Sequence, residues 1–181
     1  KSPFGDEFEL GWTHEEVISA IATHFINSYK ELPLSVYQIQ TKFRAEPRAK
    51  NGLLRCREFL MKDLYSFHTS KESLDAYYQT VIKAYAKILK RLALKAKLTE
   101  ASGGAFTKEY THEFQVLSPA GEDTVFYCRK CDFSQKKEIT KVKEGDECPN
   151  CKGEIKESRG IEVANVFKLG VRYSSAYNLK F

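Results

Sequence analysis

Four of the five cysteines stand in two closely spaced pairs, and this spacing constrains the fold more than any other feature of the 181-residue chain. The pairs follow the pattern C-x2-C-x16-C-x2-C. Two residues between cysteines let both sulfur atoms of one turn reach the same metal ion, and two such turns complete a tetrahedral zinc site with no open position. The predicted ligands of a structural Zn²⁺ are Cys128, Cys131, Cys148 and Cys151.

Two other interpretations of the pattern stay open, namely a pair of disulfides and a site that has lost zinc or holds another metal. No secretory context favours disulfides, and a duplicated pair is not typical of a thioredoxin-like redox motif. The cysteines would lie in a zinc-ribbon insertion at residues 124–158. A segment of about 35 residues cannot bury much apolar surface, so the metal would supply the free energy of its folding. Cys56 stands alone, as a small packed residue does.

The composition is that of an ordinary globular protein, with 42% hydrophobic and 29% charged residues. It excludes a disordered tail, a collagen-like fibre and a disulfide-dense miniprotein. We find no apolar run long enough to cross a membrane and no signal-peptide pattern, so a cytoplasmic protein without membrane contact is expected. The net charge of +5 permits a polyanionic partner without requiring one. Basic and acidic residues alternate in the ribbon, which favours a solvated surface over a nucleic-acid site.

Hydrophobic periodicity predicts an α+β fold. A capping-box pattern from Thr13 to Glu16 predicts the start of a helix that ends before Pro33. The period then changes to two from Ser35 to Glu46, which predicts a strand with an apolar back and a polar front. After a loop at Pro47–Gly52, a second strand from Leu54 to Tyr65 would complete an antiparallel hairpin. The face shared by the two strands would carry Arg44, Glu46, Arg55, Arg57, Phe59 and Asp63.

The remaining elements are one long helix and several short strands. Apolar residues recur at helical spacing from Lys71 to Leu92. Short strands are predicted near residues 95–100, 113–117 and 160–169.

Five long segments, which cover nearly the whole chain outside the ribbon, resemble the bacterial-type prolyl-tRNA synthetases, a family of class II aminoacyl-tRNA synthetases. The segment that begins at Phe43 resembles motif 2 of class II enzymes. The segments are LGWTHEE (Leu10–Glu16), LPLSVYQIQTKFR (Leu32–Arg44), FRAEPRAKNGLLRCREFLMKDLYSFH (Phe43–His68), THEFQVLSPAGED (Thr111–Asp123) and RGIEVANVFKLGVRYS (Arg159–Ser174).

The resemblance implies a class II antiparallel sheet flanked by helices. It also implies an enzyme that joins L-proline to tRNA(Pro) through prolyl-adenylate, with ATP as substrate and Mg²⁺ as cofactor. Both steps involve negatively charged phosphate oxygens, for which a guanidinium group on a rigid strand is well suited. Arg44 would be the catalytic residue that bridges the proline carboxylate and the α-phosphate. For ATP, Glu46 would bind the adenine amino group, Arg55 the phosphates and Phe59 the adenine ring.

The same resemblance implies a proline site made of Thr13, Glu15, Arg44, Met61, Asp63, Tyr65 and His112. Structural roles stay open for several of these residues. Thr13 could cap the helix, and Glu15 could complement the helix dipole. Asp63 could pair with Lys42 or Arg57 across the hairpin. Met61 and Tyr65 could be core residues, and His112 could be a strand histidine with satisfied hydrogen bonds.

The resemblance divides the chain into a catalytic core at residues 1–123, the ribbon at 124–158 and a return to the core at 159–181. No segment resembles motif 1 or motif 3, so we expect a piece of a longer, homodimeric enzyme that is inactive by itself. Two alternatives remain: a non-catalytic synthetase-like protein that binds tRNA or a protein partner, and a zinc-ribbon module that binds nucleic acid.

Overall fold

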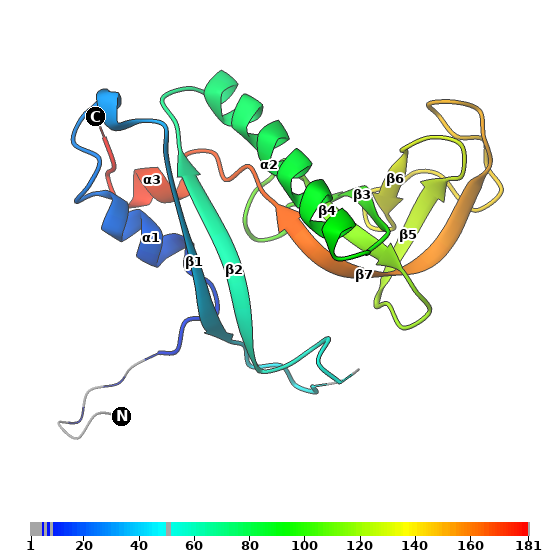
Figure 1. Ribbon diagram of the computed structural model, residues 1–181, viewed down its shortest axis with the longest axis horizontal. Helices are drawn as coiled ribbons and strands as arrows, with labels where there is room; N and C mark the ends of the chain where they lie inside the picture. Colours follow the sequence, from blue (N-terminus) through cyan, green and yellow to red (C-terminus); the bar gives the residue numbers. More distant parts are fainter. Residues whose placement is uncertain (1–4, 6, 8, 50–51, 181) are drawn as a thin grey trace. The chain divides into compact units, whose positions relative to one another are not determined.

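The strands form a two-stranded antiparallel sheet and a five-stranded closed barrel (Figure 1). The computed structural model describes residues 5, 7, 9–49 and 52–180. The chain divides into two compact units, one with residues 1–73 and 171–181 and the other with residues 74–170. The two-stranded sheet belongs to the first unit and the barrel to the second.

The first unit is built on the predicted hairpin. Strands β1 (Leu34–Phe43) and β2 (Glu58–Phe67) pair antiparallel along their whole length. The pairing sets Gln38 opposite Asp63 and Lys42 opposite Phe59, so the polar front that the sequence predicts is continuous across both strands. The strands are shorter than predicted at the turn end. Lys50 and Asn51 of the predicted loop lie outside the described residues. The start of the chain, Lys1–Pro3, also lies outside them.

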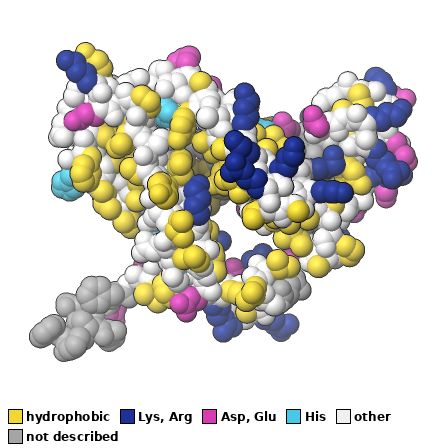
Figure 2. All heavy atoms as spheres, viewed as in Figure 1, with side chains coloured by type: hydrophobic (Ala, Val, Ile, Leu, Met, Phe, Trp, Pro, Cys, Tyr) yellow, Lys and Arg dark blue, Asp and Glu magenta, His cyan; other side chains and the backbone are white. Residues whose placement is uncertain are grey.

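Burial on this hairpin does not follow the apolar alternation. On the back, Tyr37, Ile39 and Leu60 are 71%, 61% and 69% exposed, and hydrophobic side chains are visible over the hairpin in Figure 2. On the front, Lys42 is completely buried. Part of the front is covered because the segment around His14, distant in sequence, contacts Gln38 and the end of β1.

Three short helices complete the first unit: α1 (Glu15–Ala22), the 3-10 helix η1 (Tyr29–Glu31) and α3 (Arg172–Ala176). The predicted capping box at Thr13 is wrong. The N-cap of α1 is His14, and no side chain caps the helix. The capping box belongs to η1, where Ser28 and Glu31 exchange hydrogen bonds. Helix α1 also ends well before Pro33.

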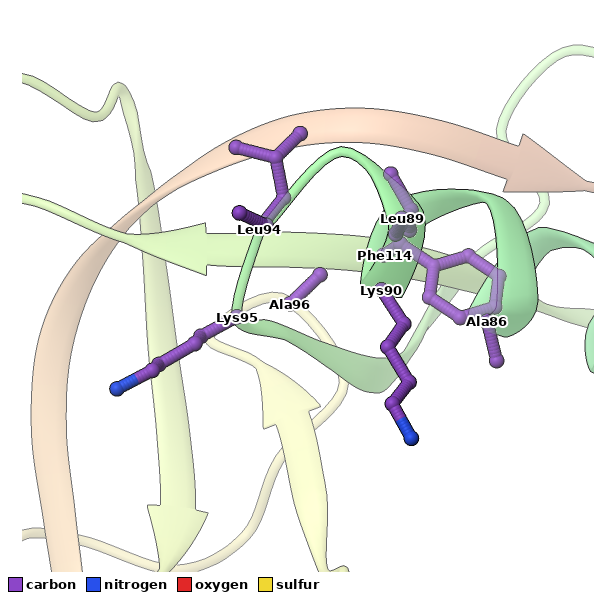
Figure 3. Close-up of a pocket in the computed structure, with 8 residues that line it drawn as sticks. Ala86, Leu89, Lys90, Leu94, Lys95, Ala96 and Phe114 are labelled. Atoms are coloured by element: carbon purple, nitrogen blue, oxygen red, sulfur yellow. The ribbon is translucent and has the colours of Figure 1, made fainter.

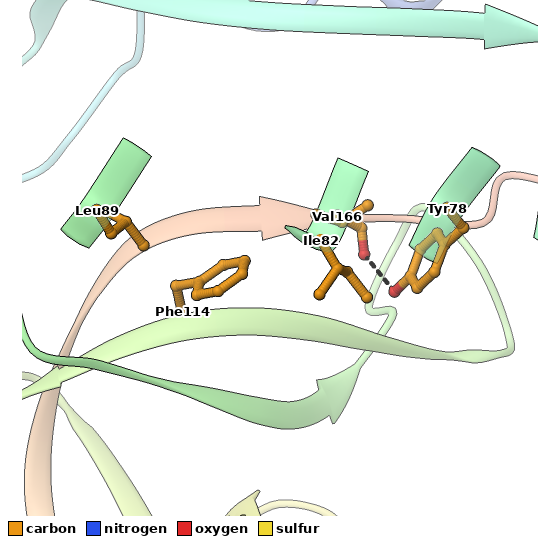
Figure 4. Packing of buried hydrophobic residues seen from close by; sticks show 5 residues of the cluster. All are labelled: Tyr78, Ile82, Leu89, Phe114 and Val166. Atoms are coloured by element: carbon orange, nitrogen blue, oxygen red, sulfur yellow. Dashed lines mark hydrogen bonds between the residues drawn. The ribbon is translucent and has the colours of Figure 1, made fainter. Parts of the chain in front are cut away.

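The second unit has its main core between a helix and the barrel. Helix α2 (Lys71–Arg91) confirms the long predicted helix. Its buried side chains meet residues from β4 (Tyr110–Leu117) and β7 (Ile155–Val166), as Figure 4 shows. The buried residues of this core are Tyr78, Ile82, Leu89, Phe114 and Val166.

The predicted ribbon is part of the barrel. It contains all of β5 (Asp123–Cys128) except its first residue, β6 (Ser134–Lys136) and the first part of β7, and β6 pairs with β3 (Ala96–Ser102). Strand β7 runs unbroken through the boundary predicted at residue 159. The compact units therefore divide the chain at other residues than the predicted insertion does. Among the described residues, no helix is long and apolar enough to span a membrane.

Candidate functional site

Asp63 is the centre of a hydrogen-bond network on the polar front of the hairpin. Its Oδ2 atom accepts hydrogen bonds from Tyr65 Oη at 2.5 Å and Gln38 Nε2 at 2.8 Å, and its Oδ1 atom lies 3.2 Å from Lys42 Nζ. Burial acts to raise the pKa of Asp63, but the three hydrogen bonds outweigh it and the pKa lies below its ordinary value. Burial and the neighbouring carboxylate raise the pKa of Tyr65. The network therefore holds a fixed carboxylate beside a protonated phenol.

The segment before α1 lies against this network. The Phe43 amide donates to Gly11 O at 3.0 Å, and Gln38 Nε2 lies 2.6 Å from His14 Nδ1. A Cβ atom at Gly11 would lie 2.3 Å from His14 Nε2, so glycine is what lets the segment pass so close to the ring. Sequence analysis did not assign a role to His14, which is 8% exposed. The glycine at position 11 was the sequence feature that could have indicated close packing around His14.

Thr13 and Glu15 interact with each other on this segment. Thr13 Oγ1 donates to Glu15 Oε2, so the hydroxyl is not used as a helix cap. Glu15 begins α1 and its charge helps to raise the pKa of Tyr65. The structure thus brings the predicted Thr-x-Glu clamp to the same face as Asp63.

Arg44 and Phe59 lie side by side at the other end of the polar front. The Arg44 guanidinium carbon lies 5.2 Å from the centre of the Phe59 ring, which is cation–π distance. Arg44 Nε donates to the Trp12 carbonyl at 3.3 Å. A planar cation is therefore held against an aromatic face at the rim of the site.

Glu46 and Arg55 form an ion pair just beyond the paired strands. Arg55 Nη1 lies 3.2 Å from both carboxylate oxygens of Glu46. The Arg55 side chain is 42% exposed, so a ligand can reach it. Arg57, the alternative partner of Asp63, instead donates to the carbonyls of Glu46 and Pro47 and shapes the turn.

Of the predicted proline-site residues, Thr13, Glu15, Arg44, Met61, Asp63 and Tyr65 all belong to the first unit. His112 belongs to the second unit, on β4, where its Nδ1 atom lies 2.9 Å from Tyr78 Oη. The alternative that Asp63 pairs with Lys42 is borne out by the structure.

The four paired cysteines gather into one cluster with their sulfur atoms within 4.8 Å of one another. The Sγ atoms of Cys128 and Cys151 are 3.5 Å apart, and those of Cys131 and Cys148 are 3.6 Å apart. These separations are far longer than a disulfide bond of about 2.05 Å and close to the roughly 3.8 Å expected between ligands of a tetrahedral zinc thiolate site. The Lys130 amide donates to Cys128 Sγ and lowers the pKa of that thiol.

The cysteines also form part of the ribbon's small core. Cys128 and Cys148 are fully buried with Phe126 and Ile155. One side of the cluster is thus packed among apolar side chains, while Cys131 is half-buried and Cys151 exposed. The four-thiol donor set suits a closed structural zinc site.

Two other features lie in the second unit. Glu113, Asp123 and Glu162 converge, and Lys136 Nζ, which lies 3.3 Å from Glu113 and 3.2 Å from Asp123, brings one positive charge to the group. An open pocket lies between the end of α2 and the start of β3, lined mainly by Leu89, Leu94 and Phe114 (Figure 3). None of the predicted site residues lines this pocket.

Comparison with known proteins agrees with these observations. All 181 residues match the family described as tRNA synthetase class II core domain (G, H, P, S and T). The chain belongs to the class II aminoacyl-tRNA synthetases. A proline–tRNA ligase of Anaplasma marginale is 42% identical to this chain over 190 residues, which include 98% of the chain. A proline–tRNA ligase of Staphylococcus saprophyticus is 49% identical over 138 residues, which include 76% of the chain. A rat protein named "Probable proline--tRNA ligase, mitochondrial" is 43% identical over the whole chain.

The chain spans 38% of the rat protein, 45% of the Anaplasma protein and 24% of the Staphylococcus protein. Its fold resembles that of Giardia lamblia prolyl-tRNA synthetase, whose structure was solved in complex with prolyl-adenylate. The TM-score is 0.71 and the sequence identity 20%, and the match covers 99% of this chain and 30% of the Giardia chain. These likenesses confirm the predicted family and the α+β class II synthetase fold.

Proposed function

We propose that the protein of which this chain is a part activates L-proline with ATP to prolyl-adenylate and transfers the prolyl group to tRNA(Pro). The observation that carries the proposal is the polar front of the β1–β2 hairpin. One continuous face presents a partly buried Asp63 whose pKa is lowered, a partly exposed Arg44 and a Phe59 ring. The relatives named as proline–tRNA ligases support the choice of amino acid.

Adenylate formation needs positive charge beside the α-phosphate, and Arg44 is the residue that would supply it. Its guanidinium group is fixed by the Phe59 ring and the Trp12 carbonyl, so little side-chain freedom is lost when it binds an anion. The carboxylate oxygen of proline attacks the α-phosphorus and pyrophosphate leaves. Arg44 would stabilise the charge that develops on the phosphoryl oxygens.

The Glu46–Arg55 pair would bind the remainder of ATP. The carboxylate of Glu46 can accept from the adenine amino group, and the exposed Arg55 can turn toward the phosphates. Phe59 would stack against the adenine ring. Magnesium would add charge neutralisation at the phosphates.

Proline selection would depend on polar groups because a small imino acid offers little apolar surface. Thr13 and Glu15 would bind the secondary ammonium group, and Asp63 would hold Tyr65 and Gln38 in place along the wall beside Met61. His112 is proposed for the same site from the family resemblance.

Zinc would bind Cys128, Cys131, Cys148 and Cys151 and would stabilise the ribbon. All four ligand positions would be taken by thiolates, so the ion would have a structural role. We also propose a homodimer for the full protein, with tRNA(Pro) as its macromolecular substrate.

Proline-dependent exchange of pyrophosphate into ATP on the full-length protein tests the proposal. We expect exchange with proline and little with threonine or serine. Arg44→Ala should reduce exchange by roughly 100-fold or more, by analogy with the loss of one transition-state donor. Arg129→Ala, which changes an exposed arginine of the ribbon, is the control and should retain activity. A folded full-length protein without exchange would favour a non-catalytic synthetase-like protein.

A further inference from the structure

The net positive charge of the chain is concentrated in and just after helix α2. Six of the 29 basic residues lie between Ala76 and Thr99, and none of the 24 acidic residues does. The rest of the sequence therefore contains 23 basic and 24 acidic residues and is close to neutral. The six basic residues are Lys83, Lys87, Lys90, Arg91, Lys95 and Lys97.

Four of these residues form one face of the helix, on the side away from the core. At 3.6 residues per turn, the four fall within an arc of about 100°. The buried side chains of α2, which are Tyr78, Ile82 and Leu89, fall on the opposite side. All four basic residues are exposed, and Figure 2 shows lysine and arginine side chains gathered where Figure 1 draws α2. We call this set the basic face of α2: Lys83, Lys87, Lys90 and Arg91.

The stability of the helix accounts for only part of this charge. Lys90 and Arg91 lie in the last turn of α2, where positive charge interacts favourably with the helix dipole. Lys87 and Lys83 lie one and two turns before Arg91, beyond the reach of that effect. They are four residues apart, and like charges at this spacing repel each other and weaken a helix. The basic face therefore has a reason other than helix stability.

The basic face also lacks carboxylate partners. Elsewhere in the second unit, Lys136 Nζ lies 3.2 Å from Asp123 and Lys168 Nζ lies 2.6 Å from Asp75. Among the described residues, by contrast, no side chain of the basic face forms an ion pair. These cations are thus available to the anionic groups of another molecule.

We propose that the basic face of α2 binds the sugar–phosphate backbone of tRNA. The inference rests on the proposed function, which requires a large polyanion to dock on the enzyme. Lys83 and Arg91 are eight residues apart, about 12 Å along the helix axis, so the face can reach adjacent phosphates. Figure 3 shows the ammonium groups of Lys90 and Lys95 pointing away from the apolar lining of the nearby pocket, so the charge continues beyond the end of α2.

The chemistry of the face determines what it contributes to binding. A lysine ammonium binds phosphate as a point charge, and phosphate contacts carry no sequence information. The basic face therefore adds affinity that depends on salt, and it does not choose between tRNA species. The alternative occupant is an acidic protein surface, which would use the same cations to stabilise the folded protein.

Binding of a tRNA(Pro) transcript to the full-length protein, measured at several salt concentrations, tests the proposal. The variant Lys83→Gln/Lys87→Gln/Lys90→Gln removes three charges and introduces residues of similar helix propensity. We expect its Kd for the transcript to rise on the order of 10-fold or more at physiological salt. The slope of the logarithm of affinity against the logarithm of salt concentration should become less steep by about 2–3, because three phosphate contacts no longer release counterions.

The matched control is Lys137→Gln/Lys141→Gln/Lys143→Gln, which removes three exposed charges from the ribbon of the same unit. It should bind the transcript as the wild-type protein does. Proline-dependent pyrophosphate exchange needs no tRNA and should be unchanged in both variants. The α2 variant should unfold at the same temperature as the wild-type protein or at a higher one, because a repulsion has been removed.

Wild-type affinity and salt dependence in the folded α2 variant overturn the proposal. An equal loss of affinity in the ribbon control overturns it as well, since total charge would then explain the effect. A lower unfolding temperature or weaker exchange in the α2 variant would assign the face to an acidic protein surface instead. A wild-type protein without proline-dependent exchange contradicts the proposed function, and the transcript titration then still decides whether α2 binds RNA.

Discussion

The ammonium group of Lys42 lies 3.2 Å from the carboxylate of Asp63, and the lysine side chain is completely shielded from solvent. A lysine is almost never found at such a position without a partner, because the loss of hydration has to be offset. Together with the hydrogen bonds from Tyr65 and Gln38, which contribute more, the pair lowers the pKa of the carboxylate around which the polar front is organised.

Replacement of Lys42 by methionine should destabilise the first unit. The substitution leaves Asp63 without its cation, and breaking a buried pair in this way costs about 3 kcal/mol or more of the free energy of unfolding. Urea unfolding followed by circular dichroism measures the change. Lys62→Met, on the exposed face of the same hairpin, should change stability by only about 0.5 kcal/mol. Equal losses in the two variants would contradict the prediction.

Gly11→Ala should disturb the site through His14. The added Cβ would lie 2.3 Å from His14 Nε2, so the imidazole has to move away from Gln38. We expect a loss of about 1–3 kcal/mol, as for other overpacking substitutions. In a His14→Ala background the same substitution should cost much less, and a double-mutant cycle measures this coupling. Additive effects would show that His14 is not the residue in conflict.

Stability should depend on pH through Glu113. Burial and the nearby Glu162 raise the pKa of Glu113 to about 7 from an ordinary 4.5. Between these values the folded state binds more protons than the unfolded state, so the contribution of Glu113 to stability falls as pH rises. The wild-type protein should lose up to about 3 kcal/mol relative to Glu113→Gln between pH 5 and pH 7.5. Metal binding is common to both proteins and cancels in the difference. A difference that is constant with pH would refute the prediction.

The cysteine cluster should bind one equivalent of zinc, measured by mass spectrometry. Chelation should remove hydrogen-exchange protection from β5, β6 and the start of β7, and weaken it in β3, because β6 pairs with β3. The β1–β2 hairpin should keep its protection, since its strands pair only with each other among the described residues. Cys148→Ser should lose the metal, and Cys56→Ser should retain it. Less than about half an equivalent of zinc in the wild-type protein would count against the assignment.

The elements with long repeating patterns were predictable from the sequence. The 21 residues of α2 and the two strands of the hairpin follow periods that local geometry imposes. The cysteine pattern also predicted which sulfur atoms meet, because metal ligands must converge on one point. Strand ends were less accurate near Arg55, where the hydrogen bonds of Arg57 to the turn replace strand pairing.

Burial on the hairpin could not be predicted from alternation. The sequence indicates that Lys42 and Ile39 lie on opposite faces, but only the packing of the segment around His14 decides which face is covered. The same limit explains Thr13, whose hydroxyl finds Glu15 rather than the helix amides. The partnership of Tyr78 with His112 joins residues 34 positions apart and leaves no local pattern.

Strand β7 extends from Ile155, which packs among the cysteines, to Val166, whose carbonyl accepts the Tyr78 hydrogen bond. Strand β7 already contains an irregularity where its pairing with β4 shifts between Phe114–Ala164 and Gln115–Glu162. With that irregularity in place, one further inserted or deleted residue between Ile155 and Val166 would change the face on which the later side chains lie. The number of residues in the strand therefore fixes the distance between the cysteine cluster and the pair formed by Val166 and His112. Natural variation in the ribbon should be confined to its turns, such as residues 137–147, and the number of residues between Ile155 and Val166 should be held constant.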